Sequence, residues 1–194
     1  THESPAAVKD AIVAGISAGN LFVNYVGHSG VLAWAHEGFF GTADFPLLEN
    51  GDRLPIMLPM TCYEGFYHYP YGQPTESMAE TILRIEGRGA VASWAPTGLG
   101  VATGHDDLNR GFLDAVFKEG VRVLGRAAMA GNLRLAATGQ NLDLLDTFLI
   151  FGDPALRINA LDADLQLSKA VEPTSEVEQG DVLTYTLTFT NTGP

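Results

Sequence analysis

The sequence predicts an α/β domain with a mostly parallel sheet, followed by the opening of an all-β domain. Short apolar runs alternate with helix-like stretches over residues 1–160, and this pattern is typical of a parallel sheet that helices cover on both faces. Apolar residues and threonines then alternate strictly over 183–190, as they do in an antiparallel strand. We therefore expect a domain boundary near residue 160, with 161–194 forming the truncated start of a second domain.

The elements of the first domain follow from helix start signals and apolar runs. Ser4 before Pro5 predicts a helix start, and Ser77 with Glu80 forms a capping-box pattern. Residues 21–26 are nearly all apolar, as expected of a strand buried on both faces. The expected helices cover 4–19, 77–87, 106–119, 122–137 and 142–150, and the expected strands cover 21–26, 54–62, 90–94 and 156–158.

The composition excludes some classes of partner. The 194-residue chain has a formal net charge of −12, which argues against nucleic acid because phosphate contacts need a basic surface. No segment approaches the roughly 18 apolar residues that predict a membrane span. We expect a secreted or cell-surface protein, and we expect the chain to be part of a longer one, because it begins at Thr1 and stops at a turn-like Thr192–Pro194.

One cysteine lies where an enzyme would place a nucleophile. The apolar run 54–60 leads directly to Thr61 and Cys62, and the run 21–26 leads to Gly27 and His28. In open α/β sheets, sites form outside the carboxyl ends of the strands. A thiol beside an imidazole is a nucleophile with its general base. A buried structural cysteine and an ordinary loop histidine remain the alternative reading.

Glycines surround both candidate catalytic groups. Gly27 and Gly30 flank the histidine, and backbone amides of Ser29, Gly30 and Cys62 are candidates for an oxyanion hole. The segment Gly27–Val31 also approaches the G-x-S-x-G elbow of serine hydrolases. That motif requires glycine where Val31 stands and a helix directly after it, so we rank Ser29 below Cys62 as a nucleophile.

No metal site is indicated. The other four histidines match no zinc signature in their spacing; they are His2, His36, His68 and His105. Asp106 and Asp107 are expected to cap the start of a helix. We expect no cofactor; structural calcium is compatible with the acidic pairs at 106–107 and 162–164, but nothing in the sequence points to it.

These motifs together resemble the gingipain family of cysteine peptidases, within the wider group that contains the caspases. The resemblance covers most of residues 5–158 and is carried by four blocks. The matching blocks are Tyr25–His28 with Trp34, Thr61–Phe66, Ala79–Glu80 with Gly89–Ala92, and Phe151–Leu156.

The resemblance implies a caspase-like three-layer α/β sandwich, of which residues 1–160 would be the carboxyl-terminal part of the catalytic domain. It implies that Cys62 forms a thioester acyl-enzyme while His28 acts as general base and general acid. Peptides and proteins would be the substrates. The family's selection of arginine or lysine is not carried over, because its pocket acid comes from a preceding part of the domain. Four neighbours of the motifs are candidate substrate-binding residues: Trp34, Glu64, Ser93 and Trp94.

The tail resembles the Ig-like repeats of bacterial surface proteins. The matching stretches are 164–169, 180–186 and 191–194, and they imply cell-surface association. Two alternatives to a peptidase stay open. A transpeptidase of the sortase type would pass the same acyl group to an amine, and a non-catalytic adhesion module would keep only the scaffold.

Overall fold

A computed structural model describes residues 4–70, 72, 76–160, 165–172 and 184–191. The chain forms two compact units, Thr1–Asn159 and Ala160–Pro194. The first unit holds a four-stranded sheet with helices, and the second holds a two-stranded sheet. Among the described helices, none combines the length and the apolar character that crossing a bilayer would require.

The central sheet is mostly parallel, as predicted. Its strands lie in the order β1 (Phe22–Val26), β4 (Ile56–Met60), β5 (Ala92–Pro96) and β6 (Phe148–Phe151). The pairs β1–β4 and β4–β5 are parallel, and β6 runs antiparallel to β5. The carboxyl ends of β1 and β4 therefore lie side by side at the same end of the sheet, where the candidate site is found.

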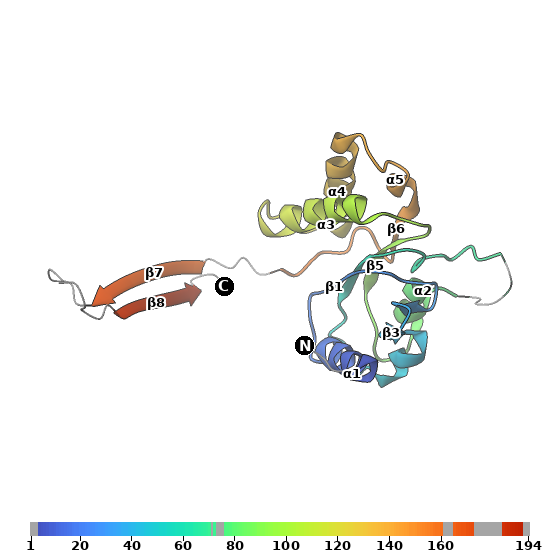
Figure 1. Cartoon of the computed structure of the whole chain (residues 1–194), viewed down its shortest axis with the longest axis horizontal. Coiled ribbons are helices and arrows are strands. Elements are labelled where there is room, and N and C mark those ends of the chain that lie inside the picture. Colours follow the sequence, from blue (N-terminus) through green and yellow to red (C-terminus); the bar gives the residue numbers. More distant parts are fainter. Residues whose placement is uncertain (1–3, 71, 73–75, 161–164, 173–183, 192–194) are drawn as a thin grey trace. The chain divides into compact units, whose positions relative to one another are not determined.

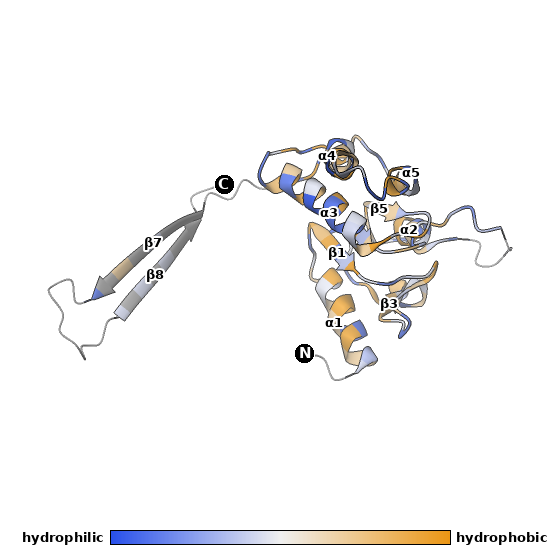
Figure 2. Cartoon of the chain, turned by 45° about the horizontal axis from the view of Figure 1, so that its top comes forward, coloured by the Kyte–Doolittle hydropathy of each residue, from blue (hydrophilic) through white to orange (hydrophobic). Residues whose placement is uncertain are grey.

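Helices cover both faces of the sheet (Figure 1). The helices α3 (Ala102–Phe117) and α4 (Leu124–Thr138) lie on one face, and α1 (Pro5–Ser17) and α2 (Met78–Arg84) lie on the other. In Figure 2, hydrophobic residues run through the sheet and along α1, whereas α3 also presents hydrophilic residues. This arrangement is the three-layer order expected from alternating strands and helices.

Side chains alternate between the two faces along β1. Phe22 meets the ring of Phe112 on α3 edge to face, with centroids 5.7 Å apart. Its neighbour Val23 packs instead into the core that includes Ile16 of α1 and Met57 of β4. Period-two alternation therefore assigns even-numbered residues of β1 to the α3 face and odd-numbered residues to the α1 face.

Start signals placed two helices correctly and one wrongly. The side chain of Ser4 accepts from the amide of Ala7, and Ser77 and Glu80 form the expected capping box. The helix predicted at 106–119 begins four residues earlier, at Ala102. Asp106 is therefore not a cap and pairs with Arg110 one turn later. The acidic pair at 106–107 was interpreted as a helix start, but its carboxylates lie on the surface of the helix, after its first turn.

Three further expectations were wrong. The predicted helix 142–150 divides into a short helix, α5 (Leu144–Thr147), and the strand β6, while 156–158 contains only an isolated bridge between Val123 and Arg157. A short apolar run does not by itself show whether it forms a helix or a strand. Here the pairing with β5 makes residues 148–151 a strand. The strand β1 is an edge strand of the sheet, so it is only partly buried.

The segment between β1 and β4 forms a small hairpin and a turn of helix. The strands β2 (Ala33–Trp34) and β3 (Phe40–Gly41) pair antiparallel, and the 3₁₀ helix η1 spans Thr42–Leu47. The sequence of residues 27–53 predicts mostly loop with a short helical turn near 43–48; the turn is confirmed, and the hairpin was not predicted. The hairpin matters because it places Trp34 beneath the histidine loop.

The second unit has two paired strands. The strands β7 (Leu165–Glu172) and β8 (Thr184–Asn191) run antiparallel, with Leu167 opposite Phe189. The antiparallel strand predicted over 183–190 is confirmed within the described residues. The remaining parts of the predicted repeat motif, at 164, 180–183 and 192–194, lie outside the described residues, and the assignment to an Ig-like repeat stays a prediction.

Candidate active site

His28 and Cys62 occupy corresponding positions on neighbouring strands. The register of the parallel pair places Val26 opposite Met60, and the amide of Gly27 donates to the carbonyl of Met60. His28 and Cys62 each follow these paired residues by two positions. Parallel, adjacent and in-register strands therefore bring the two predicted groups to the same edge of the sheet.

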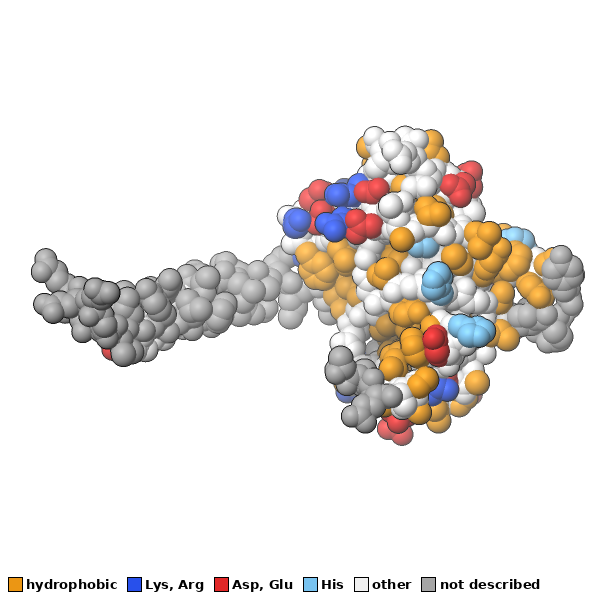
Figure 3. All heavy atoms as spheres, viewed as in Figure 1, with side chains coloured by type: hydrophobic (Ala, Val, Ile, Leu, Met, Phe, Trp, Pro, Cys, Tyr) orange, Lys and Arg blue, Asp and Glu red, His pale blue; other side chains and the backbone are white. Residues whose placement is uncertain are grey.

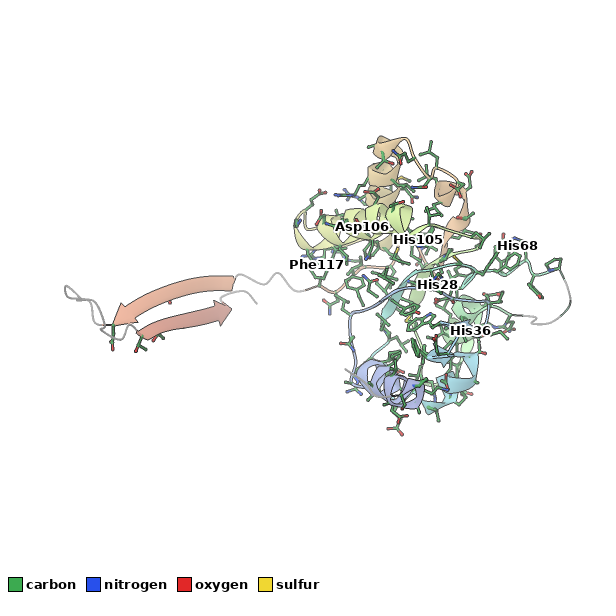
Figure 4. All side chains as sticks on the ribbon, in the orientation of Figure 1. His28, His36, His68, His105, Asp106 and Phe117 are labelled. Atoms are coloured by element: carbon green, nitrogen blue, oxygen red, sulfur yellow. The ribbon has the colours of Figure 1, made fainter. Side chains whose placement is uncertain are left out.

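The two residues line one pocket on the α3 face. Its volume is about 160 Å³, and its walls are Val26, Gly27, His28, Met60, Cys62, Gly100, Ala102 and His105. The thiol of Cys62 is partly exposed and donates to the carbonyl of Gly100 at 3.7 Å. In Figure 4, His28 and His105 lie near the middle of the first unit, on the loop after β1 and on α3.

The loop that carries the thiol is held from two sides. The amide of Tyr63 donates to the carbonyl of Gly98 at 2.9 Å, and the amide of Gly65 donates to that of Pro96 at 2.8 Å. Tyr63 has a φ of 57°, an uncommon left-handed conformation for a residue with a side chain. This turn directly after Cys62 ends the strand and leaves the thiol at its tip.

The histidine loop is also anchored through its backbone. The carbonyl of His28 accepts from the amide of Ala35 at 2.7 Å and from the hydroxyl of Tyr25 at 3.1 Å. A second cavity, of about 540 Å³, is lined by His28, by residues 29–33 and by Ala35, His36 and Tyr69. His28 therefore lies between a small pocket that contains Cys62 and a larger open cavity. Figure 3 shows histidines among hydrophobic side chains on this face.

The predicted oxyanion amides differ in availability. The amide of Gly30 donates to the carbonyl of Ala33 at 2.9 Å, so in this structure it is not free to hold an oxyanion. Within the described residues, no hydrogen bond is recorded for the amides of Ser29 and Cys62. The hydroxyl of Ser29 donates to the carbonyls of Gly30 and Ala33, and a hairpin rather than a helix follows. The serine-elbow interpretation is therefore wrong.

Glu64 lies behind the thiol loop, and its carboxyl group is buried. Its side chain accepts from the indole Nε1 of Trp34 at 2.5 Å, and it is 1% exposed. Burial raises the pKa of Glu64 to about 8, against the hydrogen bond from Trp34, which lowers it. Glu64 therefore carries a proton at neutral pH.

An aromatic stack connects Glu64 with the histidine loop. The ring of Trp34 stacks on Tyr25 with centroids 4.3 Å apart, and the hydroxyl of Tyr25 holds the carbonyl of His28. We call Glu64, Trp34 and Tyr25 the support cluster. It links the loop after β4 to the loop after β1, so it constrains the spacing of the two candidate catalytic groups.

The four candidate substrate-binding residues are almost fully buried. Trp34, Glu64, Ser93 and Trp94 are exposed by 2%, 1%, 0% and 1%, and none lines the pocket that contains Cys62. Trp34 and Glu64 belong to the support cluster, and Trp94 stacks on Phe112 in the core beneath α3. The structure does not support contact between these side chains and a substrate, because the side chains are buried beneath the site.

Sequence reasoning missed His105. It lies in the first turn of α3 and lines the Cys62 pocket, with 4% of its surface exposed. The usable signal was its place near the start of a helix that follows a parallel strand, since such starts lie at the carboxyl edge of the sheet. Among the described residues, no three His, Cys, Asp or Glu side chains are arranged to bind a metal ion.

The matching block Phe151–Leu156, which contains Gly152, Asp153 and Pro154, has a structural role. Gly152 has a φ of 117°, and a side chain there would approach Ala92. The carbonyl of Pro154 accepts from the amide of Gly125 at 2.8 Å. The block therefore joins the end of β6 to the start of α4, away from the chemistry.

The family of the chain follows from its similarity over the whole first unit. The family model of Peptidase family C25 matches residues 1–159. The chain belongs to Peptidase family C25. This membership confirms the predicted gingipain family and, at the level of the family, a cysteine-type peptidase.

Two relatives in this family are gingipains of Porphyromonas gingivalis. Gingipain R2 and Gingipain R1 are each 28% identical to the chain over 172 residues, which is 81% of the chain. The chain spans 22% of the length of that Gingipain R2 and 16% of that Gingipain R1. The chain therefore corresponds to only a small part of a whole gingipain.

Solved C25 structures share the fold. The crystal structure of the Arg-specific cysteine proteinase gingipain R covers 84% of this chain with a TM-score of 0.67 and 26% identity, and the match spans 39% of that protein. A complex of the gingipain pro- and mature domains gives a TM-score of 0.65 over 86% of this chain and 40% of that chain, at 26% identity. The mixed α/β architecture is therefore consistent with the gingipain fold.

Proposed function

We propose that the protein is an extracellular cysteine endopeptidase in which Cys62 and His28 form the catalytic dyad. The main support for this proposal is their placement. Both residues follow adjacent, in-register parallel strands, and both line the same pocket. A thiol nucleophile needs a base within reach, and strand ends position groups more precisely than long loops.

The reaction would proceed through an acyl-enzyme. The Cys62 sulfur, its proton taken by His28, attacks the scissile carbonyl and forms a tetrahedral intermediate. The amides of Cys62 and Ser29 are the donors available for the oxyanion. His28 then protonates the leaving amine as the carbon–nitrogen bond breaks, which leaves a thioester. Water, deprotonated by His28, attacks the thioester, releases the acid product and returns the proton to the thiol.

Two substitutions in the full-length protein test the dyad. We expect Cys62→Ala and His28→Ala to abolish cleavage of a casein or mixed-peptide substrate while thermal unfolding stays cooperative. His68→Ala is the matched control, because His68 is an exposed histidine on the loop after Cys62 that packs against Phe66. Retained cleavage in Cys62→Ala would exclude the proposed nucleophile.

The same assay separates the alternatives. A transpeptidase would give acyl transfer to added glycine amide at the expense of hydrolysis, because the thioester is open to any amine nucleophile. An adhesion module would cleave nothing and would be unaffected by all three substitutions. Hydrolysis that depends on Cys62 is the outcome that we expect.

We further propose that residues 161–194 begin an Ig-like repeat that holds the enzyme at the cell surface. The paired strands β7 and β8 support this proposal, because a two-stranded sheet needs further strands for independent stability. Fractionation of cells that express the full-length protein tests it. Recovery in the cytoplasm alone would contradict it.

A further inference from the structure

The start of α2 has four backbone amides that no carbonyl of the helix itself can accept. Two of them are satisfied by the capping box. The amide of Ser77 donates to the Glu80 carboxylate at 2.8 Å, and the amide of Glu80 donates to the Ser77 hydroxyl at 3.4 Å. The other two amides, those of Met78 and Ala79, need acceptors elsewhere in the fold, because buried amides are rarely left unpaired.

The acceptors of these two amides lie on the two loops that carry the candidate dyad. The amide of Met78 donates to the carbonyl of Val31 at 2.9 Å, and the amide of Ala79 donates to the carbonyl of Glu64 at 3.1 Å. Val31 lies three positions after the candidate catalytic histidine, and Glu64 lies two positions after the thiol. Consecutive peptide groups of one helix therefore fix the histidine loop and the thiol loop relative to each other.

The bond to Val31 differs from the other hydrogen bonds of the histidine loop. The carbonyls of His28, Leu32 and Ala33 accept from donors within residues 25–42, the region that contains the loop itself. The carbonyl of Val31 instead accepts from a helix that follows the thiol loop in the sequence. Local bonds can thus keep the shape of the histidine loop, whereas its distance from the thiol loop depends also on α2.

The start of α2 is itself held firmly. Met78 and Ala79 are buried, and Met78 belongs to the same core cluster as Trp34. Ser77 is buried as well, and its hydroxyl donates to the Glu80 carboxylate at 2.8 Å. The capping box therefore determines where the helix begins, and the packing of its first residues leaves the two donating amides little room to move.

We propose that Ser77 and Glu80 are positioning residues for the dyad of Cys62 and His28, and that they act by fixing the start of α2 on the two loops. The proposal rests on the proposed peptidase function. Neither residue is among the described residues that line the pocket around the thiol, so neither is expected to touch the substrate. The proposal gives a role in the site to Ala79–Glu80, a matching block that lies outside this pocket.

Removing the cap in the full-length protein tests the proposal. In Ser77→Ala the amide of Glu80 loses its acceptor and the helix start is free to shift. We expect kcat to fall by roughly tenfold to 100-fold with KM changed less than about twofold, because displacement by about 1 Å near the reacting groups costs on the order of 100-fold. Alkylation of Cys62 by iodoacetamide between pH 5 and 7 is expected to slow as well.

The conservative variant at the other half of the box is Glu80→Gln. Glutamine completes the same capping box, so Glu80→Gln is expected to keep both rates, whereas Glu80→Ala is expected to lower them. Because Glu80 is only partly buried, this pair of variants also gives the comparison if Ser77→Ala does not fold.

Ser4→Ala is the matched control. Ser4 caps α1, where its side chain accepts from the amide of Ala7 at 3.2 Å. Loss of this cap is expected to lower the melting temperature by about 2–4 °C without slowing either rate. A general loss of stability would therefore affect Ser4→Ala and Ser77→Ala alike, whereas a loss of positioning would affect kcat in Ser77→Ala alone.

Several outcomes would overturn the proposal. They are an unchanged kcat in Ser77→Ala and Glu80→Ala, a rise in KM without a fall in kcat, or a Glu80→Gln variant as slow as Glu80→Ala. The alkylation assay needs no substrate, so it separates this proposal from the peptidase function. A wild-type thiol that reacts no faster than free cysteine contradicts both, whereas a fast thiol that Ser77→Ala leaves unchanged contradicts the positioning role alone.

Discussion

Two buried ionisable groups flank Cys62, and their surroundings differ. Glu64 lies in the support cluster behind the thiol loop, where the indole of Trp34 donates to it. His105 lies in the pocket wall in front of the thiol, where its Nε2 has no partner among the described residues. Burial favours the neutral form of both, since it raises the pKa of Glu64 and lowers that of His105.

The difference lies in whether each buried group has a hydrogen-bond partner. A buried polar group with a partner within the fold stabilises the fold and is unavailable to a ligand. A buried polar group without a partner lowers the stability of the fold. On this basis Glu64 joins the two loops that carry His28 and Cys62, whereas Nε2 of His105 is left unsatisfied among the described residues.

The pH dependence of stability gives the largest expected effect. The folded protein holds the proton on Glu64 up to pH about 8, whereas the unfolded chain releases it above about pH 4.5. Unfolding between these values releases a proton, so this group makes the free energy of unfolding fall by about 1 kcal/mol per pH unit as pH rises. Denaturant titrations of wild type and Glu64→Gln between pH 4.5 and 8 measure it. Equal slopes for the two proteins would refute the neutral, buried state of Glu64.

A methyl group at position 100 is expected to disturb the pocket wall beside Cys62. In Gly100→Ala the new Cβ meets Nε2 of His105 and comes within 3.1 Å of Leu144. Displacement by about 1 Å near a nucleophile costs on the order of 100-fold in kcat/KM. Gly15→Ala is the control, since a Cβ at that position in α1 has nothing within 4 Å. Full activity in Gly100→Ala would mean that His105 can move freely.

Loss of the indole hydrogen bond is expected to destabilise the support cluster. Trp34→Phe keeps an aromatic ring against Tyr25 but leaves the Glu64 carboxyl unpaired, at a cost of about 1–3 kcal/mol in the free energy of unfolding. Trp94→Phe, at an equally buried tryptophan on the α3 face, removes a similar ring volume. If Trp34→Phe costs no more than Trp94→Phe, the hydrogen bond contributes nothing specific.

The smallest effect is expected at the far end of the cluster. Tyr25→Phe removes one hydroxyl, which donates to the His28 carbonyl at 3.1 Å, while Ala35 still donates to the same carbonyl. We expect a loss of about 0.5–1.5 kcal/mol in stability at most and a few-fold decrease in kcat with KM unchanged. A larger change in KM than in kcat would place Tyr25 in substrate binding instead of in positioning.

The sequence was sufficient to predict that His28 and Cys62 lie at the same end of the sheet, but not what surrounds them. Cys62 and His28 could be found because apolar runs reveal strands and parallel strand ends gather at one edge. The burial of Glu64 depends on Trp34, which is distant in sequence and arrives through a hairpin that local patterns did not predict. His105 was overlooked because the acidic pair after it suggested a later helix start. The strand β6 was mistaken for helix because only its pairing with β5 distinguishes the two.

The central claim is that His28 activates Cys62, and the alkylation rate of this one thiol tests it most directly. A free thiol is mostly protonated below pH 7 and reacts slowly with iodoacetamide. We expect Cys62, the only cysteine in the chain, to react faster than free cysteine between pH 5 and 7 in the full-length protein, and His28→Ala to remove that advantage. If Cys62 reacts no faster than free cysteine, or if its rate is the same in His28→Ala, the dyad is contradicted.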